Sequence, residues 1–135
     1  MRKSLLILVL LSLGLLLGAC RAEKKTATID VKILDLETQF RPNEFTVPAG
    51  EEVTFTAINY ALVRHNFIIF KKGFDAGAHF DHEDEPHIYW QIELQGGGTT
   101  TGKFTAPSEP GEYSVVCSVH THMEDGMVGK LIVVE

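Results

Sequence analysis

The sequence lacks several features that would assign it to common classes of small protein. Only two of its 135 residues are cysteines, Cys20 and Cys117, so a scaffold held together by several disulfides is excluded. Its longest mostly apolar run, Leu5–Leu17, has thirteen residues, whereas a membrane-spanning helix needs ~20. No segment shows a long apolar stripe at helical spacing. Positive charge is scarce too, since 12 basic residues stand against 18 acidic ones.

The first nineteen residues are typical of an export signal. Two basic residues precede the apolar run, and small residues follow it in the sequence Leu17-Gly18-Ala19-Cys20. This ending resembles the lipobox of bacterial lipoproteins, which implies that Cys20 is lipidated. We therefore expect residues 1–19 to be a lipoprotein signal peptide and residues 20–27 a linker. The protein would be exported and anchored through Cys20 at the periplasmic or extracytoplasmic face of a membrane. The alternative is an ordinary signal peptide that leaves Cys20 as a stray thiol.

Lipidation of Cys20 would leave Cys117 without a partner. A lone cysteine in an exported domain indicates a reactive or metal-ligating thiol. Without the signal segment the chain has 10 basic and 18 acidic residues, a formal net charge of −8. Such a charge argues against nucleic acid as a partner and suits a protein partner with a basic docking face.

Strand patterns dominate the rest of the chain, and they predict an all-β Greek-key sandwich or barrel with a single domain over residues 28–135. Turn residues separate the runs at Pro48–Gly50, Gly96–Gly98, Pro107–Gly111 and Asp125–Gly126. The predicted strands are Thr28–Leu34, Glu52–Ile58, Asn66–Phe70, Ile88–Leu94, Thr100–Thr105, Glu112–Cys117 and Val128–Val134.

Residues 75–87 differ from the strands around them. The segment, DAGAHFDHEDEPH, carries five acidic residues and three histidines with little apolar content. We interpret it as an acidic insertion exposed to solvent, with room for a helical turn.

A set of soft ligands lies between the last two predicted strands. Cys117, His122 and Met127 follow the spacing C-x4-H-x4-M. Thiolate, imidazole and thioether together suit copper, and a blue-copper site takes two histidines and a cysteine with a weak axial methionine. The second histidine must come from elsewhere in the chain, and His65 is the candidate because it stands where a loop enters a strand.

These motifs resemble those of the cupredoxins, the type 1 blue copper family. The stretch VCSVHTHMEDGMVGKLIV is similar to the family's last ligand loop and strand, as in auracyanin, rusticyanin, plastocyanin and azurin. FRPNEFTVPAGEEVTFTAIN and RHNFII are similar to its early strands and first copper histidine. The resemblance implies one copper ion, Cu(I) or Cu(II), held by His65, Cys117, His122 and axial Met127. It also implies that Asn66 hydrogen-bonds near Ser118 and joins the two ligand segments.

Several histidines are left over. His120 would suit the shorter C-x2-H spacing of plastocyanins, but Asp125 then occupies the methionine position, so His122 is the better ligand. His79, His82, His87 and His120 are candidates for a second, weaker metal site, because imidazole binds copper and zinc. The competing interpretation is a solvated loop.

The expected function is one-electron transfer by a monomer that meets redox protein partners and is attached to the membrane by its lipid. Four protein ligands leave no position for a substrate, which argues against an enzyme. The alternative is a periplasmic protein that binds or delivers copper or confers resistance to it.

Overall fold

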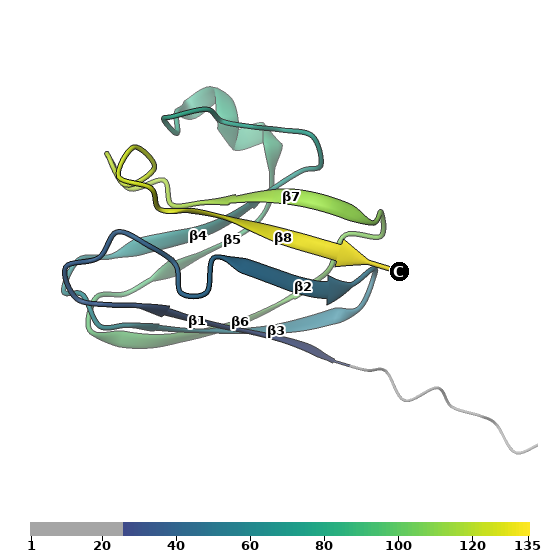
Figure 1. Cartoon of the computed structure of the whole chain (residues 1–135), viewed down its shortest axis with the longest axis horizontal. Coiled ribbons are helices and arrows are strands. Elements are labelled where there is room, and N and C mark those ends of the chain that lie inside the picture. The colour runs from purple at the N-terminus through teal and green to yellow at the C-terminus, as the bar shows by residue number, and fades with distance from the viewer. Residues whose placement is uncertain (1–25) are drawn as a thin grey trace, which may run out of the picture.

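The computed structural model describes residues 26–135, in which eight strands form two stacked sheets (Figure 1). The three-stranded sheet has the order β1-β3-β6 and the five-stranded sheet the order β2-β8-β7-β4-β5. β1 pairs with β3 and β2 with β8 in parallel, while the other pairs are antiparallel. The elements are β1 Ala27–Ile33, β2 Glu44–Pro48, β3 Glu52–Asn59, β4 His65–Phe70, the 3₁₀ helix η1 His82–His87, β5 Ile88–Leu94, β6 Gly98–Thr105, β7 Gly111–Val116 and β8 Val128–Val134.

Alternating side chains form the core between the sheets. In β3, every second residue from Val53 is buried, and β1 follows the same rule from Ile29. Aromatic rings fill the centre: Phe67 contacts Phe40, Phe45 and Phe55 at centroid distances of 4.6 to 5.4 Å. The predicted all-β sandwich with one domain is confirmed.

The sequence predicted seven strands, and the structure has an eighth, β2. This strand is short and buries only Phe45 and Val47, too few residues for a periodic pattern to be visible. It is held by parallel pairing with β8, more than eighty residues later in the chain, and such a distant partner leaves no local signal. Gly98, predicted to lie in a turn, begins β6.

The insertion between β4 and β5 is mostly exposed, as its composition indicates, but part of it packs on the sandwich. Its helical turn, η1, begins after Asp81, which caps the helix together with the buried Asp84. Phe74 and Phe80 pack over a second apolar cluster, formed by Ile68, Phe70, Val116 and Met123. β4 is therefore covered on both faces, which explains why nearly all of its residues are buried.

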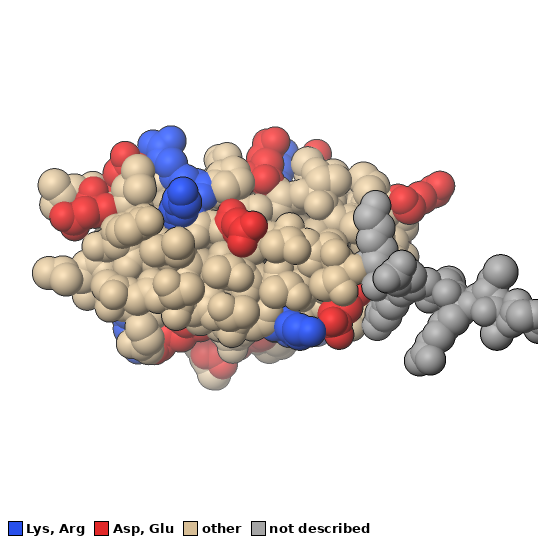
Figure 2. Space-filling view, turned by 90° about the horizontal axis from the view of Figure 1, so that it is seen from below, with Lys and Arg blue, Asp and Glu red and all other residues tan. Residues whose placement is uncertain are grey.

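Figure 2 looks onto the three-stranded sheet from outside, and this face carries few charges. Among residues 26–135, no helix is long and apolar enough to cross a membrane. The predicted signal peptide and Cys20 lie outside the described residues and stay predictions.

Candidate metal centre

The predicted ligands come together at one end of the sandwich, although His65 is far from the others in sequence. β4 begins with His65, and β7 ends one residue before Cys117. β4 and β7 are hydrogen-bonded neighbours, with Ile68 opposite Val116. This pairing places the beginning of β4 beside the end of β7, which Cys117 follows.

Three donor atoms converge there. The Nδ1 atoms of His65 and His122 are 3.1 Å apart. The Sγ atom of Cys117 lies 3.4 Å from the His122 Nδ1 atom and 3.9 Å from the His65 Nδ1 atom. Within the described part of the chain, these three residues form the only group of three or more histidine, cysteine or acidic side chains close enough to hold a metal ion.

These distances fit a shared metal ion. Metal–nitrogen and metal–sulfur bonds of about 2.0 to 2.3 Å place two ligands of one ion roughly 3 to 4 Å apart. Two imidazoles and one thiol are also the donor set that suits copper. Because the site is buried at His65 and Cys117, which are 1% and 0% exposed, water has little access to the three donors.

Met127 is buried next to this group, with no exposed surface. Its backbone is fixed by both neighbouring ligands: the Met127 N–H donates to the His122 carbonyl at 2.8 Å, and the Cys117 N–H donates to the Met127 carbonyl at 3.2 Å. The eleven-residue loop, residues 117–127, therefore returns on itself and brings Met127 back to the other ligand segments.

Asn66 joins the two ligand segments, and the structure contains the bond that the resemblance implies. Its Nδ2 atom donates to the Ser118 Oγ atom at 2.6 Å. Its backbone N–H donates to the Cys117 sulfur at 3.4 Å. The second bond stabilises negative charge on the sulfur, the form that binds a metal.

Burial sets the protonation of the three donors. It lowers the pKa of His65 to about 4, with the nearby His122 ring adding to the effect. Burial also lowers the pKa of His122, partly offset by the carboxylate of Asp125. The neutral imidazoles that a metal requires are therefore favoured near pH 7. Burial raises the pKa of Cys117, with backbone N–H groups of Asn66 and Val119 opposing it, so a metal must displace the thiol proton.

A buried asparagine that the sequence analysis did not single out shapes the loop before His65. The Asn59 side chain accepts from the Ala61 N–H at 3.1 Å and donates to the Val63 carbonyl at 2.9 Å. A longer bond of 3.4 Å reaches the carbonyl of Leu94, the residue that pairs with His65 across β4 and β5. An asparagine ending a strand before a turn is a weak signal, because asparagine is common at such positions.

The other histidines do not gather in one place. His79 contacts Glu124 at 2.7 Å, His82 contacts Glu85 at 3.2 Å, and the His87 ring stacks on Phe74. His120 is exposed on the ligand loop. A second metal site that uses these histidines together is therefore not supported by the described residues.

Comparisons with known proteins agree with the geometry. A sequence model described as "Copper binding proteins, plastocyanin/azurin family" matches residues 27–134. The chain is 40% identical to plastocyanin B of Populus nigra over 96 residues, which are 70% of this chain and 51% of that protein. It thus spans about half the length of this relative.

Two further relatives have different names. The chain is 28% identical over 120 residues to the copper-resistant cuproprotein CopI of Rubrivivax gelatinosus, covering 83% of this chain and 69% of that protein. Its structure is similar to that of reduced auracyanin from Roseiflexus castenholzii, with a TM-score of 0.70 and 31% identity over 81% of this chain and 98% of that one.

Proposed function

The chain belongs to the plastocyanin/azurin family of copper-binding proteins, and from this membership we propose that it carries single electrons with one type 1 copper ion held by His65, Cys117, His122 and Met127. The convergence of two imidazole nitrogens and one thiol sulfur within 3.1 to 3.9 Å carries the proposal. Copper bound there would supply the couple between Cu(I) and Cu(II).

The chain's own part is to hold the ligands still in both oxidation states. Strands β4 and β7 fix His65 and Cys117 from two adjacent backbones, and Asn66 joins them through Ser118. Loop hydrogen bonds fix His122 and Met127. A site whose ligands keep their positions in both oxidation states has a low reorganisation energy for electron transfer. Four side-chain ligands also leave no open position for a substrate, which argues against an enzyme.

His122 is the side chain through which an electron would leave. It is half-buried, whereas His65, Cys117 and Met127 are buried. The loop that carries it lies at the end of the sandwich opposite the start of β1 (Figure 1). The segment that would link the domain to a lipid on Cys20 precedes β1. Under the proposed export and anchoring, the start of β1 would be nearer the membrane and the ligand loop would face away from it.

We propose that the protein is a monomer and that it exchanges electrons with other redox proteins. Removal of the signal segment leaves a net charge of −8, which favours a partner protein whose docking face is basic. Association should then slow as salt is raised, because screening weakens attraction between unlike charges. A rate that is independent of ionic strength would argue against a basic partner.

The alternative, copper delivery or resistance, has weaker support. It rests on the 28% identity to CopI, while the plastocyanin and auracyanin relatives are more similar to this chain. A visible spectrum separates the two functions. An electron carrier loaded with copper absorbs intensely in the red, and a reductant bleaches this band reversibly. Tight Cu(I) binding without a reversible couple would indicate a delivery protein instead.

A further inference from the structure

The imidazole of His65 has no hydrogen bond that would hold its ring in place for a metal. Its Nδ1 atom faces the other donors, 3.1 Å from the Nδ1 atom of His122. Its Nε2 atom is buried and has no hydrogen-bond partner among the described residues. A metal-ligating histidine almost always donates its other ring N–H to a carboxylate, a carbonyl or water, and this bond fixes the ring. The position of His65 therefore depends on the backbone around it.

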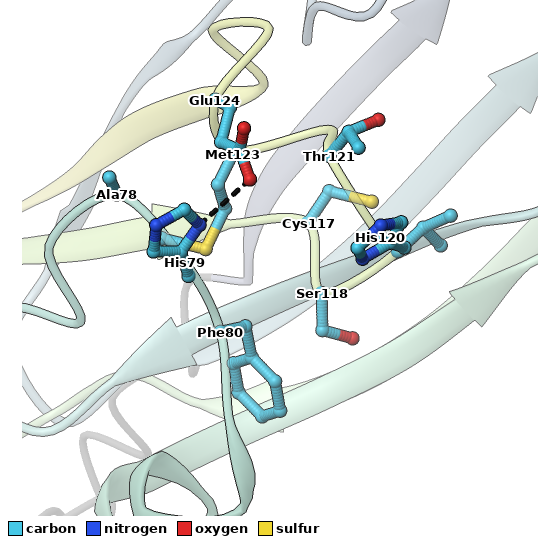
Figure 3. Close-up of a pocket in the computed structure, with 10 residues that line it drawn as sticks. Ala78, His79, Phe80, Cys117, Ser118, His120, Thr121, Met123 and Glu124 are labelled. Carbon is cyan, nitrogen blue, oxygen red and sulfur yellow. Dashed lines mark hydrogen bonds and ion pairs between the residues drawn. The ribbon is translucent and has the colours of Figure 1, made fainter.

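The acidic insertion lies against a different part of the site. A cavity of about 260 Å³ lies between residues 78–80 of the insertion and the ligand loop (Figure 3). His65 does not line this cavity, and the Cys117 sulfur points away from the insertion side chains. Support for the start of β4 must come from another segment.

The loop that precedes His65 has little apolar packing of its own. Leu62 and Val63 are 90% and 56% exposed, and Arg64 is exposed too. Of residues 61–64 only Ala61 is buried. Hydrophobic burial therefore contributes little to the position of this loop.

Asn59 holds both this loop and the strand opposite His65 by hydrogen bonds. Its side chain is 2% exposed. The carboxamide accepts from the Ala61 N–H at 3.1 Å and donates to the Val63 carbonyl at 2.9 Å and the Leu94 carbonyl at 3.4 Å. Leu94 is the β5 residue that pairs with His65. One side chain thus reaches both the loop two residues before the ligand and the residue opposite it.

The backbone of Asn59 belongs to the other sheet. It ends β3, the central strand of the three-stranded sheet, which pairs with β1 and β6, whereas Leu94 ends β5 of the five-stranded sheet. The carboxamide therefore joins the two sheets at the end that carries the ligands. The bond between Asn66 and Ser118 joins the two ligand segments but does not reach the three-stranded sheet.

We propose that Asn59 is the positioning residue of His65, whose carboxamide sets the place of the imidazole before a metal binds. The proposal rests on the proposed function in that His65 is taken as a copper ligand. Loss of the Asn59 amide should weaken metal binding through His65 alone. Cys117, His122 and Met127 keep their places, because their own backbone hydrogen bonds hold them.

Zinc affinity, measured by competition with a chromophoric chelator, tests this role without redox chemistry, because Zn(II) accepts histidine and cysteine ligands. Every protein would carry Cys20→Ser, so that this thiol binds no metal. Asn59→Ala should bind Zn(II) about 10- to 100-fold more weakly than the starting protein, the range typical of losing a group that orients a metal ligand. Asn59→Ser should be weakened as well, since its hydroxyl can still accept from the Ala61 N–H but is too short to reach the Val63 and Leu94 carbonyls.

Val47→Ala is the matched control. Val47 is fully buried and pairs with Val133, at the end of β8 remote from the ligand loop. This variant loses packing and stability but should keep the zinc affinity of the starting protein. Unchanged affinity in Asn59→Ser, an equal loss in Val47→Ala, or Asn59 variants that do not fold although Val47→Ala does, would give Asn59 a purely structural role and overturn the proposal. A starting protein that bound no zinc would instead contradict the proposed function.

Discussion

At the scale of single residues, the site depends on side chains that are already buried in the metal-free protein, His65 above all. The Nε2 atom of His65 is buried and has no hydrogen-bond partner among the described residues. A positive charge on this ring would be neither solvated nor paired, and that cost is the reason for its lowered pKa. Stability of the metal-free protein should therefore respond to pH through this residue.

The sign follows from the change in pKa on unfolding. The pKa of His65 is about 4 in the folded protein and returns to 6.5 in the unfolded chain. Between these values the unfolded chain binds the extra proton, so acid favours unfolding. The free energy of unfolding should fall by up to about 3 kcal/mol between pH 6.5 and pH 4, and the full contribution is present above pH 6.5.

Denaturant titrations of the metal-free protein across this range would measure the effect. His65→Gln should reduce this pH dependence, leaving the contribution of His122, whose pKa is also lowered by burial. His82→Ala should leave the pH dependence unchanged. A free energy of unfolding that rises as the pH falls from 6.5 to 4, or an identical pH profile in His65→Gln, would contradict this explanation.

The bond between Asn66 and Ser118 gives a second prediction at this scale. A net contribution of about 1 kcal/mol to stability is typical of one hydrogen bond, so Asn66→Ala and Ser118→Ala should each destabilise the protein by about this amount. Because both variants lose the same 2.6 Å bond, the double variant should be less destabilised than the sum of the two. Strict additivity in a double-mutant cycle would mean that the two side chains are not coupled.

At the scale of elements, the loop that precedes His65 depends on a glycine from the neighbouring turn. A Cβ atom at Gly96 would lie 2.0 Å from the Leu62 carbonyl oxygen, a backbone atom. The Gly97 N–H also donates to the Ala61 carbonyl at 2.8 Å. The turn between β5 and β6 therefore packs directly against the loop between β3 and β4, and this contact helps to place the first residue of β4.

Gly96→Ala should push this loop away and destabilise the protein by about 1 to 3 kcal/mol, the usual cost of an added group without space. Gly98→Ala is the control, since the nearest atom to its Cβ would be 3.8 Å away. Chemical denaturation of both variants would measure the difference. Equal stability of the two would show that the close approach of Gly96 to Leu62 is not a constraint.

The sequence predicted elements well where the signal is local. Alternation located β1, β3 and β5 to within one residue at each end, because inward side chains alternate with outward ones, mostly buried in β1 and β3 and mostly half-buried in β5. Local patterns could not reveal β2, whose partner β8 is distant in the chain. They also could not show that Phe74 and Phe80 cover β4, since each is an isolated apolar residue in a mostly polar segment and its contacts form only in the fold.

At the scale of the whole molecule, the candidate site combines one local motif with one distant residue. The spacing C-x4-H-x4-M was readable because Cys117, His122 and Met127 belong to one turn. His65 was chosen because it stands where a loop enters a strand, and the family resemblance implied the same residue. The pairing of β4 with β7 that brings it to Cys117 could not be predicted from the sequence. The position of Met123 followed from neither, since it depends on the insertion that packs above it.

The central claim is that one copper ion is held at this end of the sandwich through the Cys117 sulfur. The most direct test is the visible spectrum of the copper-loaded protein beside that of Cys117→Ser, with metal content measured in both. The account predicts an intense red absorption for the unmodified protein, bleached reversibly by a reductant, and loss of this band in the variant. A variant that kept the band with a full equivalent of copper would contradict it.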